Sequence, residues 1–261
     1  MQEREVHALA AVEHRHWWYR SLHRRVLRLL RQEARRLGRP LVVFDAGCGT
    51  GGLLQELKHQ PFLAGAAGCE LDPVALAYCH QRGLPVESLS VNALDRCPHR
   101  YDVVLSMDVL YHQGVKPAVA LRGMAQLLRP GGLLLLNVAA MPCLRRPHDG
   151  RVMGVRRFRP RPLRRLVEGA GLRPESLHYW NAWLTPLLWV KLQLRRWRLA
   201  PRESMRKEDR ATSEVALPPP VLNRLLLLLL RLEELLAPWL PLPWGSSLFL
   251  KARREPTLAR R

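Results

Sequence analysis

Short apolar runs alternate with amphipathic segments through the first two thirds of the chain. A helical pattern covers residues from about 13 to 37, before the break at 38–40. Strand-like runs then lie at 41–47, 63–72, 84–88, 101–110 and 133–140, with helical patterns at 51–60, 73–83 and 116–132 between them. Strands that are apolar through most of their length and alternate with helices indicate a parallel sheet covered on both faces. The pattern therefore predicts a doubly wound α/β fold with a mostly parallel sheet.

The last third of the chain has a different pattern. One more helix over 157–172 and a strand over 173–183 precede an insertion rich in Leu, Trp, Arg and Pro, and a last strand covers 245–254. The predicted sheet thus has seven strands. We expect three parts: an N-terminal helical cap at 1–40, a core at 41–184 and 244–254, and an apolar helical insertion at 185–243.

The insertion holds two apolar helical segments, "PLLWVKLQLRRWRL" and "PPPVLNRLLLLLLRLEELL". The leucine run 225–230 is bounded by Arg224 and Arg231, and it is too short to span a bilayer, which takes about 20 apolar residues. Two readings remain open: an interfacial helix in an anionic leaflet, or a helical hairpin that covers the active site or makes a homodimer. Either one favours a bulky apolar or lipid-linked acceptor over a small metabolite.

Charge and cysteine content narrow the class of protein. The 42 Lys and Arg residues against 22 Asp and Glu give a net charge of +20, which attracts polyanions such as nucleic acid or an anionic membrane face. Nucleic acid is not favoured as a substrate, because zinc-finger spacing and RNP-like aromatic motifs are missing. The five scattered cysteines include no C-x-x-C pair, so neither disulfides nor a metal site is expected. Since the N-terminus lacks the apolar core of a signal peptide, we expect a cytoplasmic protein, peripheral to the inner membrane face if the insertion binds lipid.

The stretch "VVFDAGCGTGGLL" ends the first strand in a glycine-rich turn. Gly47, Gly49 and Gly52 fit the G-x-G-x-x-G pattern of dinucleotide-binding folds. Asp45 disfavours that reading, because a carboxylate at this turn would repel a pyrophosphate. An acid suits S-adenosylmethionine, which carries a sulfonium and an α-ammonium and has no phosphates.

Several motifs resemble those of class I S-adenosylmethionine-dependent methyltransferases. "DAGCGTG" resembles their first motif, acid-x-G-x-G-x-G, with Gly47, Gly49 and Gly51 at the glycine positions. Glu70 in "GCELDP" matches the acid that binds the ribose hydroxyls in that family. "YDVVLSMDVLYH" and "LLRPGGLLLLNV" resemble the motifs around the fourth and fifth strands, and two closing strands resemble the family's antiparallel hairpin. The resemblance implies the Rossmann-like methyltransferase fold and S-adenosylmethionine as cofactor.

The resemblance also assigns cofactor-binding positions. The expected cofactor-binding residues are Asp45, Gly47, Cys48, Gly49, Thr50, Gly51, Glu70, Leu71, Ser90, Asn92, Met107 and Trp18. Two positions depart from the family pattern. Ser90 or Asn92 replaces the acid that often holds the adenine amine, and Tyr111 stands where an acid is common in a subgroup.

That subgroup is bacterial and often occurs among envelope polysaccharide and polyprenol-linked functions. "EHRHWWYRSLHRRVL" and "RRFRPRPLRRLVEGAGL" resemble it, including its H-W-W motif near the start. The resemblance implies that Trp17, Trp18 and Tyr19 form a lid over the cofactor. Docking of the helix to the core is the alternative role for these aromatic residues.

Methyl transfer needs alignment and exclusion of water, and a base helps only where the acceptor is a hydroxyl. The candidate bases are His112, after the fourth strand, and His148 and Asp149, after the fifth. His112 ranks first by position, with packing beside the cofactor as its alternative. Three further residues, Arg156, Arg157 and Phe158, are candidates for binding an anionic acceptor.

The sequence therefore predicts an S-adenosylmethionine-dependent methyltransferase acting on an oxygen or nitrogen of a small-molecule or lipid-linked acceptor. Two alternatives stay open. One is an RNA or protein methyltransferase, which the basic charge permits. The other is a non-catalytic methyltransferase-like partner subunit, although Asp45 and Glu70 are both retained.

Overall fold

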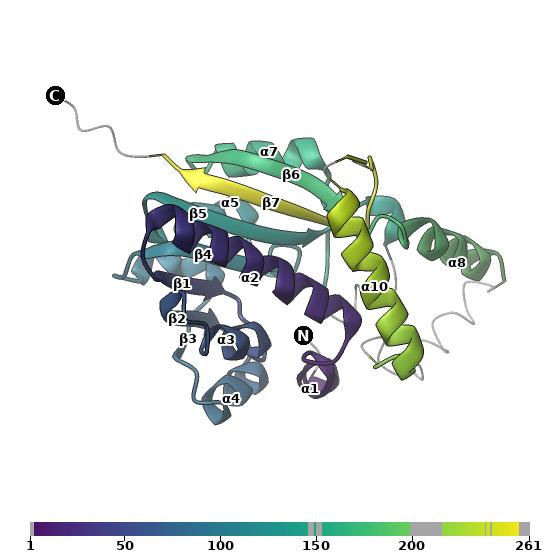
Figure 1. The fold of residues 1–261 in the computed structure, drawn as a ribbon, viewed down its shortest axis with the longest axis horizontal. Coiled ribbons are helices and arrows are strands. Elements are labelled where there is room, and N and C mark those ends of the chain that lie inside the picture. The colour runs from purple at the N-terminus through teal and green to yellow at the C-terminus, as the bar shows by residue number, and fades with distance from the viewer. Residues whose placement is uncertain are drawn as a thin grey trace.

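Seven strands form one twisted sheet in the order β3-β2-β1-β4-β5-β7-β6 (Figure 1). The structure is a computed structural model. It describes residues 3–145, 149, 153–198, 216–237, 239–240 and 242–255. The strands are β1 (Leu41–Ala46), β2 (Leu63–Glu70), β3 (Val86–Ser88), β4 (Tyr101–Met107), β5 (Leu128–Ala139), β6 (Leu172–Trp180) and β7 (Ser247–Arg254).

Helices connect the strands in the alternating pattern that the sequence predicts. They are α1 (Glu3–Val12), α2 (Trp17–Leu37), α3 (Gly52–Leu57), α4 (Pro73–Gln81), α5 (Pro117–Leu127), α7 (Pro160–Glu168), α8 (Thr185–Arg198) and α10 (Pro220–Leu236), with short 3₁₀ turns η1 (Val91–Arg96) and η2 (Pro142–Leu144). The predicted doubly wound α/β fold with seven strands is confirmed.

The order of the sheet reverses next to β1. The chain moves outward from β1 to β2 and β3, then returns to place β4 on the other side of β1, and all of these neighbours are parallel. The last strand, β7, inserts antiparallel between β5 and β6. In an open parallel sheet, ligands bind beyond the carboxyl ends of the strands where the order reverses, so the fold directs a ligand to the ends of β1 and β4.

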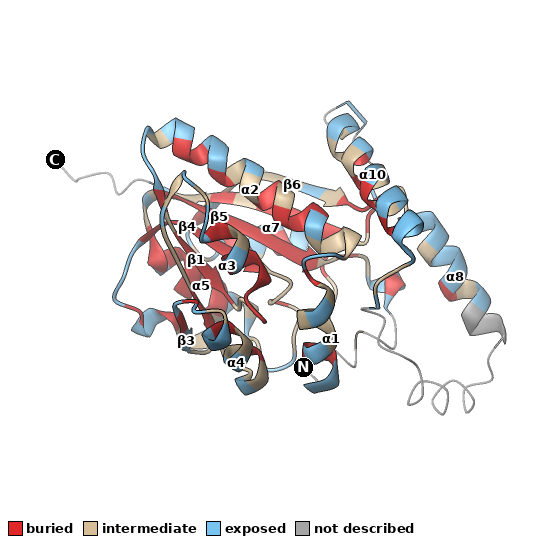
Figure 2. Cartoon of the chain, turned by 60° about the horizontal axis from the view of Figure 1, so that its bottom comes forward, coloured by how far each residue is buried: buried red, intermediate tan, exposed pale blue. Residues whose placement is uncertain are grey.

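Helices cover both faces of the sheet, which explains the uninterrupted apolar runs in the central strands (Figure 2). On one face α5, α7 and η1 pack on side chains such as Phe44 and Val104. On the other face α2, α3 and α4 pack on the alternate residues, such as Val43 and Leu105. Successive residues of one strand thus supply two separate cores.

The N-terminal helix predicted over 13–37 is α2, which begins later, at Trp17, and a separate helix that the sequence did not predict, α1, precedes it. The chain turns between α1 and α2, and His16 caps α2 by accepting a hydrogen bond at its Nδ1 from the Trp18 N–H at 3.3 Å. Such an N-cap favours the start of a helix at this point, because it satisfies an N–H group of the first turn that would otherwise be unpaired. Along α2, Leu22, Val26 and Leu30 are buried at successive four-residue steps.

Both helical segments predicted in the insertion are present, as α8 and α10, and they lie between β6 and β7 in the chain. α10 rests against α2 (Figure 1). Its Glu234 pairs with Arg28 at 2.7 Å and with Arg24 at 3.4 Å, both from α2. In the part of the chain that the structure describes, no helix combines the length and the apolar character needed to cross a membrane.

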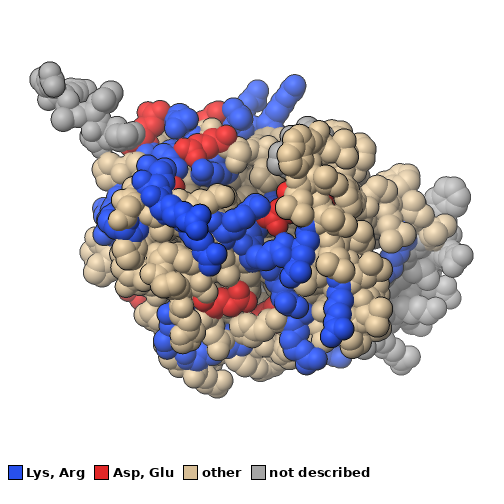
Figure 3. Space-filling model, in the orientation of Figure 1, with Lys and Arg blue, Asp and Glu red and all other residues tan. Residues whose placement is uncertain are grey.

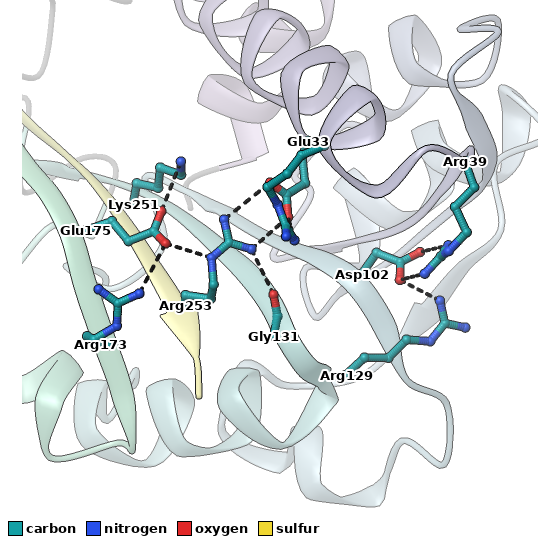
Figure 4. Close-up of polar contacts among 10 residues, drawn as sticks. Glu33, Arg39, Asp102, Arg129, Gly131, Arg173, Glu175, Lys251 and Arg253 are labelled. Atoms are coloured by element: carbon teal, nitrogen blue, oxygen red, sulfur yellow. Dashed lines mark hydrogen bonds and ion pairs between the residues drawn. The ribbon is translucent and has the colours of Figure 1, made fainter. Parts of the chain in front are cut away.

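Two buried carboxylates fix the end of the sheet opposite to the ligand edge (Figure 4). Asp102 accepts hydrogen bonds from Arg39 and Arg129, both at 2.7 Å, and from the Val42 N–H at 2.9 Å. Burial alone would raise the pKa of Asp102, but these partners lower it to about 2. In the second cluster Arg253 joins β7 to Glu33 of α2 at 2.7 Å.

We predict that Asp102→Asn lowers the free energy of unfolding by about 2 kcal/mol, because a buried acceptor for two arginines is weakened. The folded pKa lies below the ordinary value of 3.8, so this stabilisation is present above pH 4 and is lost as the pH falls towards 2. Urea unfolding at pH 7 and pH 3 measures both effects. Glu168→Gln removes an exposed pair with Arg164 at 3.9 Å and serves as a control that should change stability by less than about 0.5 kcal/mol. If both variants lose the same free energy of unfolding, Asp102 does not stabilise the fold in the way proposed.

Candidate functional site

A cavity of about 1010 Å³ opens at the carboxyl ends of β1, β2 and β4. Its walls also include residues of α1 and α2 on the N-terminal side and of α8 and α10 from the insertion. The cavity therefore lies where the reversal of strand order places a ligand site.

Asp45 ends β1 as a buried carboxylate with an unsatisfied oxygen. Its side chain lines the cavity, and among the described residues its Oδ1 has no hydrogen-bond partner. The pKa of Asp45 is raised to about 7, chiefly by burial, with His23 opposing the shift and the negative charge of Glu70 adding to it. A buried acceptor without a donor costs free energy unless a ligand supplies one, so Asp45 is suited to a cationic or N–H-bearing group.

The glycine loop after β1 is shaped for close approach of a ligand. At Gly47, where φ is +84°, a Cβ would lie 2.6 Å from the side chain of Val109, so a larger residue does not fit. At Gly49, with φ at +57°, a Cβ would meet no atom within 4 Å, and the glycine leaves this part of the cavity wall open. The loop is thus tight on its protein side and open on its cavity side.

Glu70 fixes the loop from the end of β2. Its Oε2 accepts a hydrogen bond from the Gly49 N–H at 2.8 Å, and its Oε1 accepts from Leu71 N–H at 2.7 Å and Asp72 N–H at 2.9 Å. Each carboxylate oxygen can accept about two bonds, so Oε2 keeps capacity for a ligand hydroxyl.

The segment between α1 and α2 is tied directly to the glycine loop. Glu13 is buried, accepts a hydrogen bond from the Thr50 hydroxyl at 2.8 Å and pairs with Arg82 at 2.5 Å. Arg82 also donates to the Thr50 carbonyl at 2.8 Å. The N-terminal helices are therefore fixed against the loop by buried charged groups.

A second buried carboxylate, Asp108, follows β4. It lines the cavity in the left-handed conformation, with φ at +62°, which is uncommon for a residue other than glycine. Asn137 donates to its two oxygens at 3.0 and 2.9 Å and accepts from Trp180 Nε1–H at 2.7 Å. Trp180 in turn stacks on Trp18 with ring centroids 5.4 Å apart.

Burial raises the pKa of Asp108 to about 7, against the opposing effect of hydrogen bonds from Asn137 and Tyr111. Tyr19 and Tyr111 also line the cavity, and the charge of Asp108 adds to the effect of burial in raising the pKa of each phenol. A carboxyl group that titrates near neutral pH is suited to accept a proton.

The candidate Asp149 forms a bidentate ion pair. Arg157 donates to it from Nε at 2.6 Å and from Nη2 at 2.9 Å, and donates from Nη1 to the Ala140 carbonyl at 2.9 Å. Both carboxylate oxygens therefore hold Arg157 in the cavity wall. The candidate His148 lies outside the described residues.

The family follows from a match over most of the chain. A family described as "Methyltransferase domain" matches residues 14–177, which include the glycine loop, Glu70 and Asp108. The chain belongs to the methyltransferase domain family. Together with the fold, this membership confirms the predicted class I S-adenosylmethionine-dependent methyltransferase.

Among its relatives, this methyltransferase is 37% identical over 103 residues to a protein of Cereibacter sphaeroides named ubiquinone biosynthesis O-methyltransferase. The match covers 37% of this chain and spans 40% of the length of the relative.

Solved structures share the fold at low sequence identity. The complex of the Haloferax volcanii Trm112 methyltransferase activator with a methyltransferase has a TM-score of 0.55 at 16% identity, covering 97% of this chain and 98% of that one. The [4+2]-cyclase SpnF has a TM-score of 0.52 at 18% identity, covering 88% of this chain and 80% of that one. The same fold thus supports more than one chemistry.

S-adenosylmethionine is the cofactor of this methyltransferase, and the residues present fit it. Asp45 offers a buried carboxylate oxygen to a cationic group, and Gly49 leaves room along the loop. Glu70 would hold the ribose, because its Oε2 lies beside the loop with capacity to accept from a hydroxyl.

The structure brings together nearly all of the residues that the sequence singled out. Every expected cofactor-binding residue lines the cavity except Gly51, and so do the candidates His112, Asp149, Arg156 and Arg157. Gly51 instead caps α3 and packs against Leu84 and Cys79, where a Cβ would lie 2.5 Å from Leu84. The buried Phe158 pairs with Ala140 through the backbone and belongs to the core under α7.

The polar side chains expected to hold the adenine amine have partners within the protein. The Ser90 hydroxyl accepts from the Asn92 N–H at 3.2 Å. Asn92 accepts from the Lys116 N–H at 2.9 Å and donates to the Gly114 carbonyl at 2.8 Å. Asn92 therefore fixes the loop before α5, next to the cavity.

Sequence reasoning missed Glu13, Asp108 and Asn137. Asp108 lies in the stretch "MDVLYH", directly after an apolar strand, and an acid at the carboxyl end of a predicted strand could have been recognised as a site residue. Glu13 gave no such signal, because its partners Thr50 and Arg82 lie 37 and 69 residues away.

We predict opposite effects of Asp45→Asn on binding and on stability. Calorimetry should find affinity for S-adenosylhomocysteine reduced at least about tenfold, because a carboxylate in the cavity is lost. Without ligand, the variant should be more stable than the wild type at pH 8 by up to about 3 kcal/mol. The folded pKa of Asp45, about 7, lies above the ordinary value of 3.8, so the wild type loses stability as the pH rises from about 4 to 7 and Asp45 ionises.

The exposed Asp95, outside the cavity, gives the matched control Asp95→Asn, which should change neither quantity. If Asp45→Asn binds S-adenosylhomocysteine with the affinity of the wild type, Asp45 does not contact the cofactor.

Proposed function

We propose that this protein transfers the methyl group of S-adenosylmethionine to an oxygen or nitrogen nucleophile, with a hydroxyl on an apolar or lipid-linked acceptor favoured. The observation that carries the proposal is the buried Asp108, which titrates near neutral pH in the same cavity as Asp45 and Glu70. The relative named ubiquinone biosynthesis O-methyltransferase supports an oxygen acceptor.

The acceptor side of the cavity has an apolar wall. Leu184, directly before α8, and Leu187 and Leu188, near its start, line the cavity, and Leu226 lines it from α10. Apolar walls favour an acceptor with apolar surface, because burying that surface removes it from water. This wall supports a small or lipid-linked molecule over RNA or a folded protein as the acceptor.

Asp108 is the proposed general base. When bound, S-adenosylmethionine supplies a methyl group activated by its sulfonium. The residues of this chain orient the acceptor, exclude water and take the proton of its hydroxyl at an Asp108 oxygen. Asn137, held by Trp180, fixes the carboxylate, while Trp18 and Tyr19 shield the cavity from the side of α2.

The positive groups of the cavity suggest where an anionic part of the acceptor binds. Arg157 is held by Asp149, and Arg156 lines the cavity beside it. A guanidinium pairs well with phosphate or carboxylate. In this proposal Asp149 positions Arg157 and is not the base.

We predict that Asp108→Asn lowers kcat for a phenolic acceptor with an alkyl tail by about 100-fold or more, as expected for loss of a general base. In the wild type, kcat/KM should fall about tenfold per pH unit below pH 7, because the base must be ionised, and the variant should lose this dependence. Transfer of a labelled methyl group from S-adenosylmethionine into extracted product is the measurement.

His112→Asn separates the two candidate bases. The His112 ring stacks on Tyr111 at 4.7 Å, so this variant should mainly change KM. If His112→Asn instead abolishes the pH dependence and Asp108→Asn retains it, the base is His112. Calorimetry with S-adenosylhomocysteine confirms that both variants keep the cofactor site.

A further inference from the structure

The outward side of α10 is a continuous apolar stripe. Val221, Leu225, Leu228, Leu232 and Leu235 recur at steps of four and three residues, and each side chain is between 48% and 79% exposed. This spacing places them on one side of the helix.

The inward side of the same helix is partly polar. Asn223 accepts from the Trp17 N–H at 2.9 Å and donates to the Arg15 carbonyl at 2.9 Å. Near the other end, Glu233 accepts from the N–H groups of Ala182, at 2.9 Å, and Trp183, at 3.0 Å. These bonds fix the rotation of α10, so the leucine stripe cannot turn inward without breaking them.

The apolar surface extends beyond α10. Figure 2 shows exposed residues along α8 and α10 where they project from the core. The other large apolar residues exposed in this region are Leu187, Trp189, Val190 and Leu194 of α8, and Leu222, Leu236, Trp239, Leu240 and Trp244. This many exposed large apolar residues on two helices of one insertion indicates an interaction site.

Basic side chains gather next to this surface. Figure 3 shows Lys and Arg collected over α2, on the same face of the molecule as the largely uncharged surface of α10. Arg20, Arg28 and Arg31 of α2 are among the exposed ones. The chain as a whole carries a net charge of +20.

We propose that the α8–α10 surface, defined as the exposed apolar residues named above, docks on an anionic lipid bilayer. An interfacial helix buries an apolar side in the acyl boundary, and neighbouring cations contact anionic headgroups. Trp189, Trp239 and Trp244 are suited to the headgroup level, where an apolar ring with one polar N–H is favoured.

A second copy of this chain is a less suitable occupant. Pairing two copies through this surface would bring two basic α2 helices towards each other, and each chain carries +20. Like charges oppose such a contact, whereas an anionic bilayer attracts it.

The docking surface reaches the mouth of the cavity. Leu187 both lines the cavity and is 69% exposed, and Lys191, one turn further along α8, lines the cavity as well. An acceptor with a lipid tail would pass from the bilayer along α8 to Asp108 without crossing water. This route rests on the function proposed above, whereas the docking surface rests on its own exposed residues.

Flotation with vesicles tests the surface without any methyl-transfer reaction. The full chain is mixed with vesicles of phosphatidylcholine alone or with one third phosphatidylglycerol. The test variant is Leu225→Gln/Leu228→Gln/Leu232→Gln, which changes exposed residues only. We expect binding to the anionic vesicles, weaker binding to the neutral ones, and a partition coefficient at least about tenfold lower for the variant.

A pair of charge variants provides a matched comparison. Arg20→Gln/Arg31→Gln on α2 should weaken binding to anionic vesicles by about tenfold. Arg161→Gln/Arg164→Gln removes two exposed charges from α7, which packs on the opposite face of the sheet, and should bind as the wild type does.

Thermal unfolding and S-adenosylhomocysteine binding verify that every variant is folded. The proposal is overturned if the wild type does not float or if the leucine variant floats as well as the wild type. It is also overturned if sedimentation finds that the wild type is a dimer and that the leucine substitutions alone make it a monomer. If the wild type floats with anionic vesicles but transfers no methyl group, the proposed function is refuted and the proposed docking surface is not.

Discussion

Burial of an uncompensated carboxylate is the constraint on which the site depends. Asp45 lies in the sheet core at the end of β1, shielded from water, with an oxygen that no group in the described part of the chain satisfies. Holding a charge there disfavours folding until a ligand supplies a positive partner. The surrounding fold must therefore be stable by itself, and the ion pairs of Asp102 and Glu33 fix the opposite end of the sheet. The ion pairs that stabilise the fold and the residues that line the cavity therefore lie at opposite ends of the sheet.

The N-terminal helices complete the cavity by electrostatic and aromatic contacts rather than by apolar packing alone. Glu13 ties the turn between α1 and α2 to Thr50, and Trp18 stacks on Trp180. Trp180 also holds Asn137, which in turn holds Asp108. The cap, the cofactor loop and the proposed base thus form one connected network, so movement of α2 would change the position of the carboxylate that is proposed to accept a proton.

The insertion helix α10 is apolar on both sides. It turns Asn223, Leu227, Leu230 and Glu233 towards the protein and a second set of leucines towards the outside. Polar anchors specify one orientation, because each buried bond would be lost on rotation, whereas leucine packing tolerates several. The insertion therefore presents a fixed apolar surface beside the cavity mouth, and this arrangement connects the outer surface of the protein to its acceptor site.

The sequence by itself determined the fold class and the cofactor half of the site. Period-two and helical patterns are local, and Asp45, the glycines and Glu70 lie next to strand ends whose position follows from the order of elements. The tertiary structure decided the rest. The break between α1 and α2, the pairing of Asp149 with Arg157, the selection of Asp108 over His112 as proposed base and the outward direction of the leucines in α10 each depend on partners elsewhere in the fold. Burial and charge compensation are properties of such packed surroundings, and local sequence patterns do not contain them.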